Sequence, residues 1–172
     1  MAINDIRILK GGLTVQRFRT EANVTVGMQP GDAIKGQIGT GTNYVGVCLD
    51  GDPEQETDVF FGVSKNAGTE TASADGVIDV ELVQSGTVME CKANTTSNVD
   101  TDAKLLALLL DQVTFDRSAA TAAGTLTVDE NEGTDAVVHG IMILDGRITD
   151  GMLFITPMCA CLGIGKQDAT AV

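Results

Sequence analysis

The stretch FFGVSKNAGTETASADGVIDVELVQSGTVMECKA, residues 60–93, decides the expected fold. Residues 77–82 alternate between two faces, with Ile78, Val80 and Leu82 expected inward and Val77, Asp79 and Glu81 outward, which is the period of a β-strand with one buried face. The alternation resumes in residues 88–93 after a short turn segment, so the two runs together predict a β-hairpin. In the second run the expected inward residues are Met89, Cys91 and Ala93, and the expected outward residues are Glu90 and Lys92. Nothing in this stretch is typical of a catalytic site.

The composition predicts one β-rich domain. A chain of 172 residues with 43% hydrophobic residues is long enough to bury a core. Trp is absent and there are only one Tyr and five Phe, so Val, Ile, Leu, Ala and Met are expected to form that core. Twenty glycines favour turns and strands over helices. Further strand candidates are residues 6–9, 24–26, 33–38, 44–49, 112–116, 124–128, 136–144 and 152–162.

These strands are short and are separated by glycine turns, which favours a β-sandwich or a barrel. We therefore predict a mainly β fold: a small β-sandwich or β-barrel-like domain with one short helix and an extended N-terminal arm. The arm and first strands are expected in residues 1–27, and a single β-rich domain in residues 28–172. The segment GIMILDGRITDGMLFITP, residues 140–157, is the clearest late hairpin, with turns expected at Asp145/Gly146 and Asp150/Gly151.

One segment has a helical pattern. Asp100 or Thr101 is suited to cap a helix, and Asp102 would sit in its first turn, where a negative charge favours the helix dipole. The leucines of residues 105–110 recur at helical spacing, which predicts a helix of about three turns with its leucines in the core. A buried apolar strand is the alternative, because six apolar residues in a row do not distinguish the two.

The net charge of −13 limits the partners. So acidic a surface is repelled by phosphate backbones, and we expect no direct contact with nucleic acid. The first 20 residues differ, since they carry four basic residues against one acidic residue: Arg7, Lys10, Arg17 and Arg19 against Asp5. Two interpretations stay open, a solvated strand and turn, or a basic arm that docks on an acidic partner.

The residues that commonly bind metals are few or poorly spaced. All four cysteines, Cys48, Cys91, Cys159 and Cys161, lie in apolar or strand-like runs and are expected to be buried. His139 is the only histidine and is expected to be structural, so a Cys/His metal site is not predicted. The acidic run at residues 50–58 lacks the glycine and the final glutamate of an EF-hand and is expected to be a solvated loop, with adventitious calcium as the alternative. No cofactor is expected.

Catalytic and targeting motifs are also missing from the sequence. There is no nucleophile elbow, no HExxH and no complete phosphate loop, so we expect no enzymatic activity. The first 20 residues have no continuous apolar segment of the length a secretory signal needs, and synthesis in the cytoplasm is expected. The run at residues 105–110 is too short to span a bilayer, so we expect no membrane partner.

Residues 30–93 resemble the capsid decoration proteins of tailed bacteriophages, also called head-stabilising or cement proteins. The resemblance lies in Gly62 and Val63, the small-residue loop at 69–74, the Asp75–Gly76 turn, the alternating strand after it, and then Gly86 and Val88. The phrases PGDAIKGQ at residues 30–37 and YVGVCL at residues 44–49 are similar in style. The C-terminal third matches loosely.

This resemblance implies a structural virion protein with no catalytic residues. It would bind the major capsid protein on the outer surface of the matured head, as a homo-oligomer with a trimer favoured over a dimer, and stabilise the shell. We expect the N-terminal segment to contribute the capsid contact, by strand addition or charge pairing. The predicted capsid-binding residues are Ile6, Arg7, Ile8, Leu9, Lys10, Arg17 and Arg19. The alternative function is a phage tail or surface fibre protein that binds a receptor or glycan, although the chain has few aromatic residues for such a site.

Overall fold

The computed structural model describes residues 6–22, 27–37, 44–49, 51–53, 58–117, 125–131 and 140–158. Within these residues it confirms a mainly β fold with a barrel and one short α-helix. The strands are β1 (Arg7–Lys10), β2 (Val15–Thr20), β3 (Ala33–Gln37), β4 (Tyr44–Val47), β5 (Asp58–Ser64), β6 (Gly76–Leu82), β7 (Val88–Lys92), β8 (Gln112–Arg117), β9 (Leu126–Asp129), β10 (Ile141–Arg147) and β11 (Met152–Pro157). The helices are the 3₁₀ turn η1 (Thr96–Asn98) and α1 (Asp102–Leu108).

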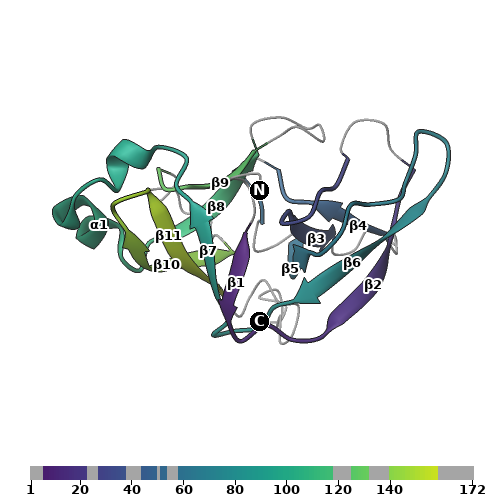
Figure 1. The fold of residues 1–172 in the computed structure, drawn as a ribbon, viewed down its shortest axis with the longest axis horizontal. Coiled ribbons are helices and arrows are strands. Elements are labelled where there is room, and N and C mark those ends of the chain that lie inside the picture. Colours follow the sequence, from purple (N-terminus) through teal and green to yellow (C-terminus); the bar gives the residue numbers. More distant parts are fainter. Residues whose placement is uncertain are drawn as a thin grey trace, which may run out of the picture.

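The strands form two units that lie side by side (Figure 1). One is a six-stranded sheet in the order β1-β7-β11-β10-β8-β9, with α1 at its far end. The other is a closed barrel in the order β2-β4-β3-β5-β6. Consecutive strands β1 and β2 lie in different units, and so do β6 and β7, so the chain crosses from one unit to the other at both places.

The predicted hairpin between residues 77–82 and 88–93 is wrong in its pairing, although both strands form. Strand β6 pairs with β2 and β5, whereas β7 pairs with β1 and β11. Between them, Thr87 N–H donates to the carbonyl of Gln84 in a turn, and the chain leaves the barrel for the sheet. Alternation tells which face of a strand is buried and does not tell which strand lies beside it.

The N-terminal residues predicted as an extended arm form β1 and β2. They are extended, but they lie along the two units and do not project from them. Strand β1 pairs antiparallel with β7, and β2 pairs antiparallel with β6 over its whole length. The connection continues this pairing, because Leu13 N–H donates to the carbonyl of Leu82 at 2.8 Å.

The predicted helix starts where expected and ends early. The Thr101 hydroxyl accepts a hydrogen bond from the backbone N–H of Lys104 at 3.3 Å, and α1 then runs for seven residues. It ends because Leu109 turns to an extended ψ of 131° and Leu110 takes a φ of +70°. Leu105 is buried, as predicted. Two other leucines of this run, Leu106 and Leu110, are exposed, which corrects the prediction that the leucines all lie in the core.

The late hairpin is confirmed as β10 and β11, paired antiparallel. Its turn lies at residues 148–151, and the first expected turn is wrong: Asp145 and Gly146 belong to β10, where the register shifts between Ile143 and Asp145. The bulge absorbs the extra residue and lets the strand continue. The strand candidate at residues 24–26, together with His139, Cys159 and Cys161, falls outside the described residues.

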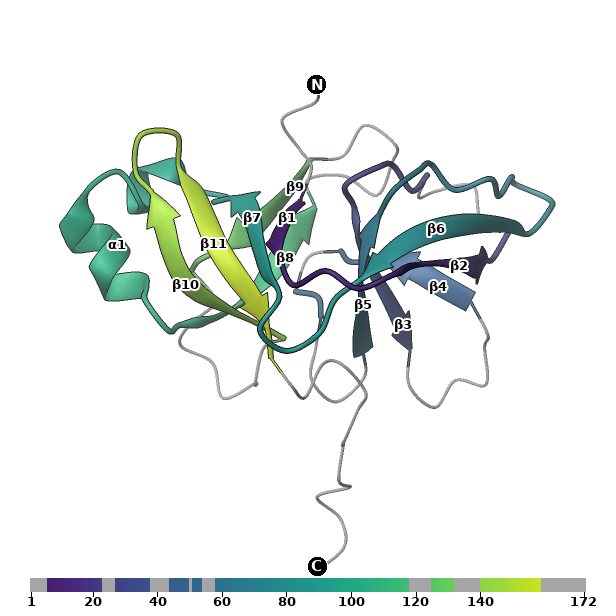
Figure 2. The same cartoon turned by 60° about the horizontal axis from the view of Figure 1, so that its bottom comes forward.

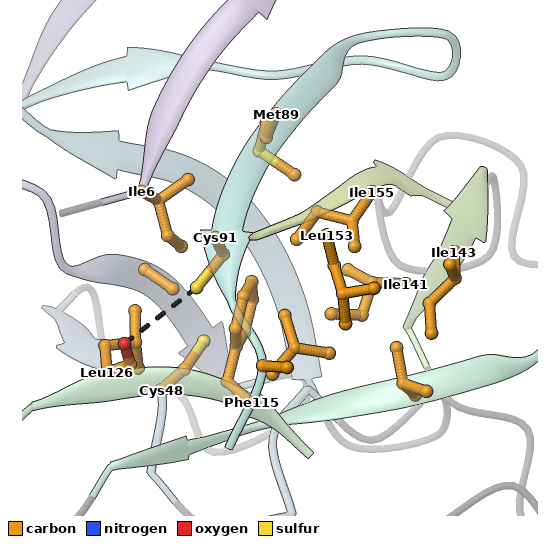
Figure 3. Close-up of a cluster of buried hydrophobic side chains, with 14 of the residues drawn as sticks. Ile6, Cys48, Met89, Cys91, Phe115, Leu126, Ile141, Ile143, Leu153 and Ile155 are labelled. Atoms are coloured by element: carbon orange, nitrogen blue, oxygen red, sulfur yellow. Dashed lines mark hydrogen bonds between the residues drawn. The ribbon is translucent and has the colours of Figure 1, made fainter. Parts of the chain in front are cut away.

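One large apolar core joins the two units. It contains residues of the six-stranded sheet and residues from the barrel side, and Phe60 of the barrel packs edge-on against Phe115 of β8 with ring centroids 5.7 Å apart. Figure 3 shows part of this core, where the Cys91 side chain points toward Leu126, and Ile141 and Ile155 lie beside Leu153. A second cluster fills the barrel. Both units therefore depend on shared packing, which is the main favourable term in folding.

The cysteines in the described residues are buried, as predicted. Cys48 and Cys91 are free thiols in the shared core, and the Cys91 thiol donates a weak hydrogen bond to the carbonyl of Leu126 at 3.9 Å (Figure 3). Burial raises the pKa of Cys91 to about 12. Because the thiolate is the reactive form, Cys91 is a packing residue.

Candidate docking surface

Within the described residues, the N-terminal strands have one edge without a neighbouring strand. Strand β1 ends the six-stranded sheet and pairs only with β7. Among the described residues, strand β2 pairs with β6 on one side, and on the other side it meets β4 at Arg19 and Thr20. Among the described strands, none lies beside the outer side of β1 or of residues 15–18. Unpaired backbone of this kind is a template for pairing with another chain.

Every residue along this edge is exposed from residue 9 to residue 17. We call residues 9–17 the edge segment. Figure 2 shows it passing from β1 to β2 across the junction of the two units. Three of its residues are large and apolar: Leu9 is 43% exposed, Leu13 45% and Val15 52%. A run of apolar residues on an open strand edge marks a surface suited to another protein.

The three predicted arginines of this region bind acidic residues of the same chain. Arg7 Nη2 lies 2.5 Å from the carboxylate of Glu90, which is buried, contrary to its predicted outward position. Arg17 forms a two-pronged contact with Asp79, with N···O distances of 2.7 and 3.0 Å. Positive charge that is already balanced inside the chain contributes less to docking on an acidic partner.

Arg19 belongs to a third cluster, on the barrel. Its guanidinium lies 3.6 Å from Asp75 and 5.3 Å from the ring centroid of Tyr44, a cation–π arrangement. The Tyr44 hydroxyl donates to Asp75 at 2.6 Å, and this bond lowers the pKa of Asp75 and raises the pKa of Tyr44. For Lys10 the structure gives no ion-pair partner among the described residues.

The predicted apolar anchors fall into two groups. Ile6 is 3% exposed and Ile8 is partly buried, and both pack in the shared core. Leu9 is exposed and available to a partner. Sequence reasoning missed Leu13 and Val15, whose apolar side chains stand two residues apart in an otherwise polar stretch and are the signal that would have found them.

The Arg17–Asp79 pair is testable by titration. The hydrogen bond from Arg17 holds the pKa of Asp79 below its ordinary value of about 3.9. A carboxyl whose pKa is lowered by folding stabilises the protein above that ordinary value, and the contribution is lost as the pH falls through the lowered pKa. We expect Arg17→Ala to raise the pKa of Asp79 toward about 3.9 in a carboxyl NMR titration.

Asp150 supplies the control for this titration. Its pKa is lowered by a hydrogen bond from Arg147 and not by Arg17, so it should be the same in Arg17→Ala and in the unchanged protein. An Asp79 pKa that stays low in Arg17→Ala would show that the guanidinium is not the cause.

Comparison of the chain with protein families, with curated proteins and with solved structures found no match. Within the described ranges, no group of three or more His, Cys, Asp or Glu side chains is arranged to hold a metal ion. No helix in those ranges has the length and apolar character needed to cross a membrane.

Proposed function

We propose that this chain is a capsid decoration protein of a tailed phage, and that its edge segment docks on the major capsid protein. The observation that carries the proposal is the open strand edge, exposed from residue 9 to residue 17 and lined by Leu9, Leu13 and Val15. The resemblance of residues 30–93 to decoration proteins supplies the identity of the partner. A protein that binds the assembled shell and not its dissociated subunits stabilises the shell by mass action.

Strand addition is the mode of docking that the edge supports best. Intramolecular ion pairs already engage Arg7, Arg17 and Arg19. These arginines therefore contribute little to charge pairing with a partner. The open edge instead provides backbone N–H and C=O groups for an extended capsid segment, and the three apolar residues provide side-chain contacts. The net charge of −13 fits a position on the outside of the head, away from the packaged DNA.

Point substitutions test this docking mode, because deleting the N-terminus would remove two paired strands and Ile6 of the core. We expect the triple variant Leu9→Ser, Leu13→Ser, Val15→Ser to bind matured heads about tenfold more weakly, since it removes apolar side chains that the partner would bury. The measurement is the occupancy of purified heads stripped of the protein, titrated with each variant.

The matched control is Thr14→Ser with Gln16→Ser, which alters the same segment and keeps its apolar residues. Thermal unfolding should be nearly the same for both variants, because all five positions are exposed. Occupancy of the triple variant equal to that of the control would contradict docking through this edge. Failure of the unchanged protein to bind heads would contradict the function itself.

A further inference from the structure

Two further exposed apolar residues lie in and just after α1, beside β10 of the six-stranded sheet. Leu106 is 66% exposed and Leu110 is 67% exposed, and both exceed every apolar residue of the edge segment in exposure. We call these two residues the helix patch. They lie at the C-terminal end of α1, which Figures 1 and 2 place at the end of the protein farthest from the barrel.

Leu110 has a backbone conformation that disfavours leucine. Its φ of +70° is left-handed, and a position just after a helix with this φ is usually occupied by glycine or asparagine. Two hydrogen bonds hold the backbone in this conformation. The Leu110 N–H donates to the carbonyl of Ile143 at 2.9 Å, and the Asp111 N–H donates to the carbonyl of Leu108 at 3.1 Å. The Leu110 side chain is exposed, so packing within this chain does not offset the strain of that backbone conformation. We therefore expect the side chain to be buried in a contact with another protein.

The charges beside the patch select the partner. Residues 100–111 contain three aspartates and one lysine, and that lysine, Lys104, pairs with Asp100 at 2.8 Å. Asp102 and Asp111 remain to flank the leucines with negative charge. A second copy that presented the same patch would bring aspartates against aspartates, which is unfavourable. A partner with basic residues beside its apolar side chains fits this surface.

We propose that the helix patch is a second docking surface, which binds a capsid segment with apolar side chains flanked by lysine or arginine. This inference rests on the proposed function, and it adds that one molecule contacts the shell at two separated places. Two linked contacts hold a protein far more tightly than either alone, since the second forms within an already bound complex. A molecule attached at two places also ties together the capsid elements it contacts.

The test is the variant Leu106→Ser with Leu110→Asn, bound to the same purified heads. We expect about tenfold weaker binding, because two apolar side chains lose their partner. Its thermal unfolding temperature should be equal to or above that of the unchanged protein, because asparagine tolerates the left-handed φ at residue 110. The matched control is Ala103→Ser with Ala107→Ser, which alters exposed positions of the same helix and leaves both leucines in place.

A second variant tests the charge of the partner. We expect Asp102→Asn with Asp111→Asn to bind heads more weakly and with a smaller dependence on salt concentration. Binding that is unchanged in both strength and salt dependence would overturn the basic character of the partner.

The possible failures are distinguishable. If the unchanged protein binds heads and the leucine variant binds equally well, the helix patch is overturned and the proposed function stands. If light scattering shows that the leucine variant has a smaller oligomeric state than the unchanged protein, a second copy of the protein covers the helix patch. The proposal that a capsid segment binds this patch is then overturned. If the unchanged protein does not bind heads, both proposals fall together.

Discussion

Replacement of Arg117 by alanine is expected to lower the free energy of unfolding by about 3–5 kcal/mol. The Arg117 side chain is fully buried, and its Nη2 atom donates to Asp32 at 3.1 Å and to the carbonyl of Gly27 at 3.3 Å. Arg117 ends β8 of the six-stranded sheet, and Asp32 immediately precedes β3 of the barrel. The pair therefore ties the two units together inside the protein.

The expected loss is large because the substitution leaves Asp32 charged and buried. Asp32 is 4% exposed and also accepts a hydrogen bond from the backbone N–H of Gln29 at 2.7 Å. Without the guanidinium, this carboxylate loses an ion-pair partner in a site from which water is largely excluded. Removing one partner of a buried ion pair is costly, whereas an exposed charge is solvated and screened.

Chemical denaturation with urea measures this effect, and Arg17→Ala is the matched control. Arg17 also binds an aspartate, Asp79, but its side chain is 67% exposed. We expect the control to lose much less stability, because exposed ion pairs contribute little. Equal losses in the two variants would show that the buried pair adds no stability beyond an exposed one.

The positions of most described strands could be predicted from the sequence, because burial on one face imposes a period of two. Ile78, Val80, Met89 and Cys91 were expected to point inward, and all four are at most 1% exposed. The start of α1 was also predictable, since a Thr side chain that accepts from the third following N–H is a local signal. These features depend on residues close together in the sequence.

Strand partners could not be predicted in the same way. The pairing of β6 with β2 joins residues about 60 apart, and no local pattern distinguishes it from the nearer pairing with β7. Burial of Glu90 follows from the same limit, because it depends on Arg7 and Arg147 from two other strands. From the sequence alone, a polar residue is assigned to the outer face of a strand, because the neighbours that pair with its charge are not known.

The candidate site was partly predictable for a related reason. Charge counting selected Arg7, Arg17 and Arg19, but it could not show that acidic residues of β6, β7 and the loop before β6 pair with them. Leu9 was already among the predicted capsid-binding residues, and exposure in the folded chain added Leu13 and Val15. The proposed docking surface is therefore an apolar edge in place of a basic arm.

Gly62 is a position where the fold tolerates no side chain, and Gly62→Ala is expected to cost at least about 3 kcal/mol. Gly62 lies in β5 opposite Leu82 of β6, next to the register shift in the pairing of β5 with β3. A Cβ atom there would lie 2.9 Å from the carbonyl carbon of Glu81 and closer still to its carbonyl oxygen. Backbone atoms of a paired strand cannot rotate away as a flexible side chain can, so the barrel wall itself would have to open.

Gly46 in β4 separates this clash from a general effect of alanine in the barrel. A Cβ atom at Gly46 would meet nothing within 4 Å, and no left-handed φ is required there. We expect Gly46→Ala to change the free energy of unfolding by less than about 1 kcal/mol, with a gain possible from reduced freedom of the unfolded chain. Urea denaturation of both variants provides the comparison. Similar stability of the two would mean that β5 and β6 do not approach as closely at Gly62 as the barrel requires, whereas a large loss confined to Gly62→Ala would confirm the closed barrel.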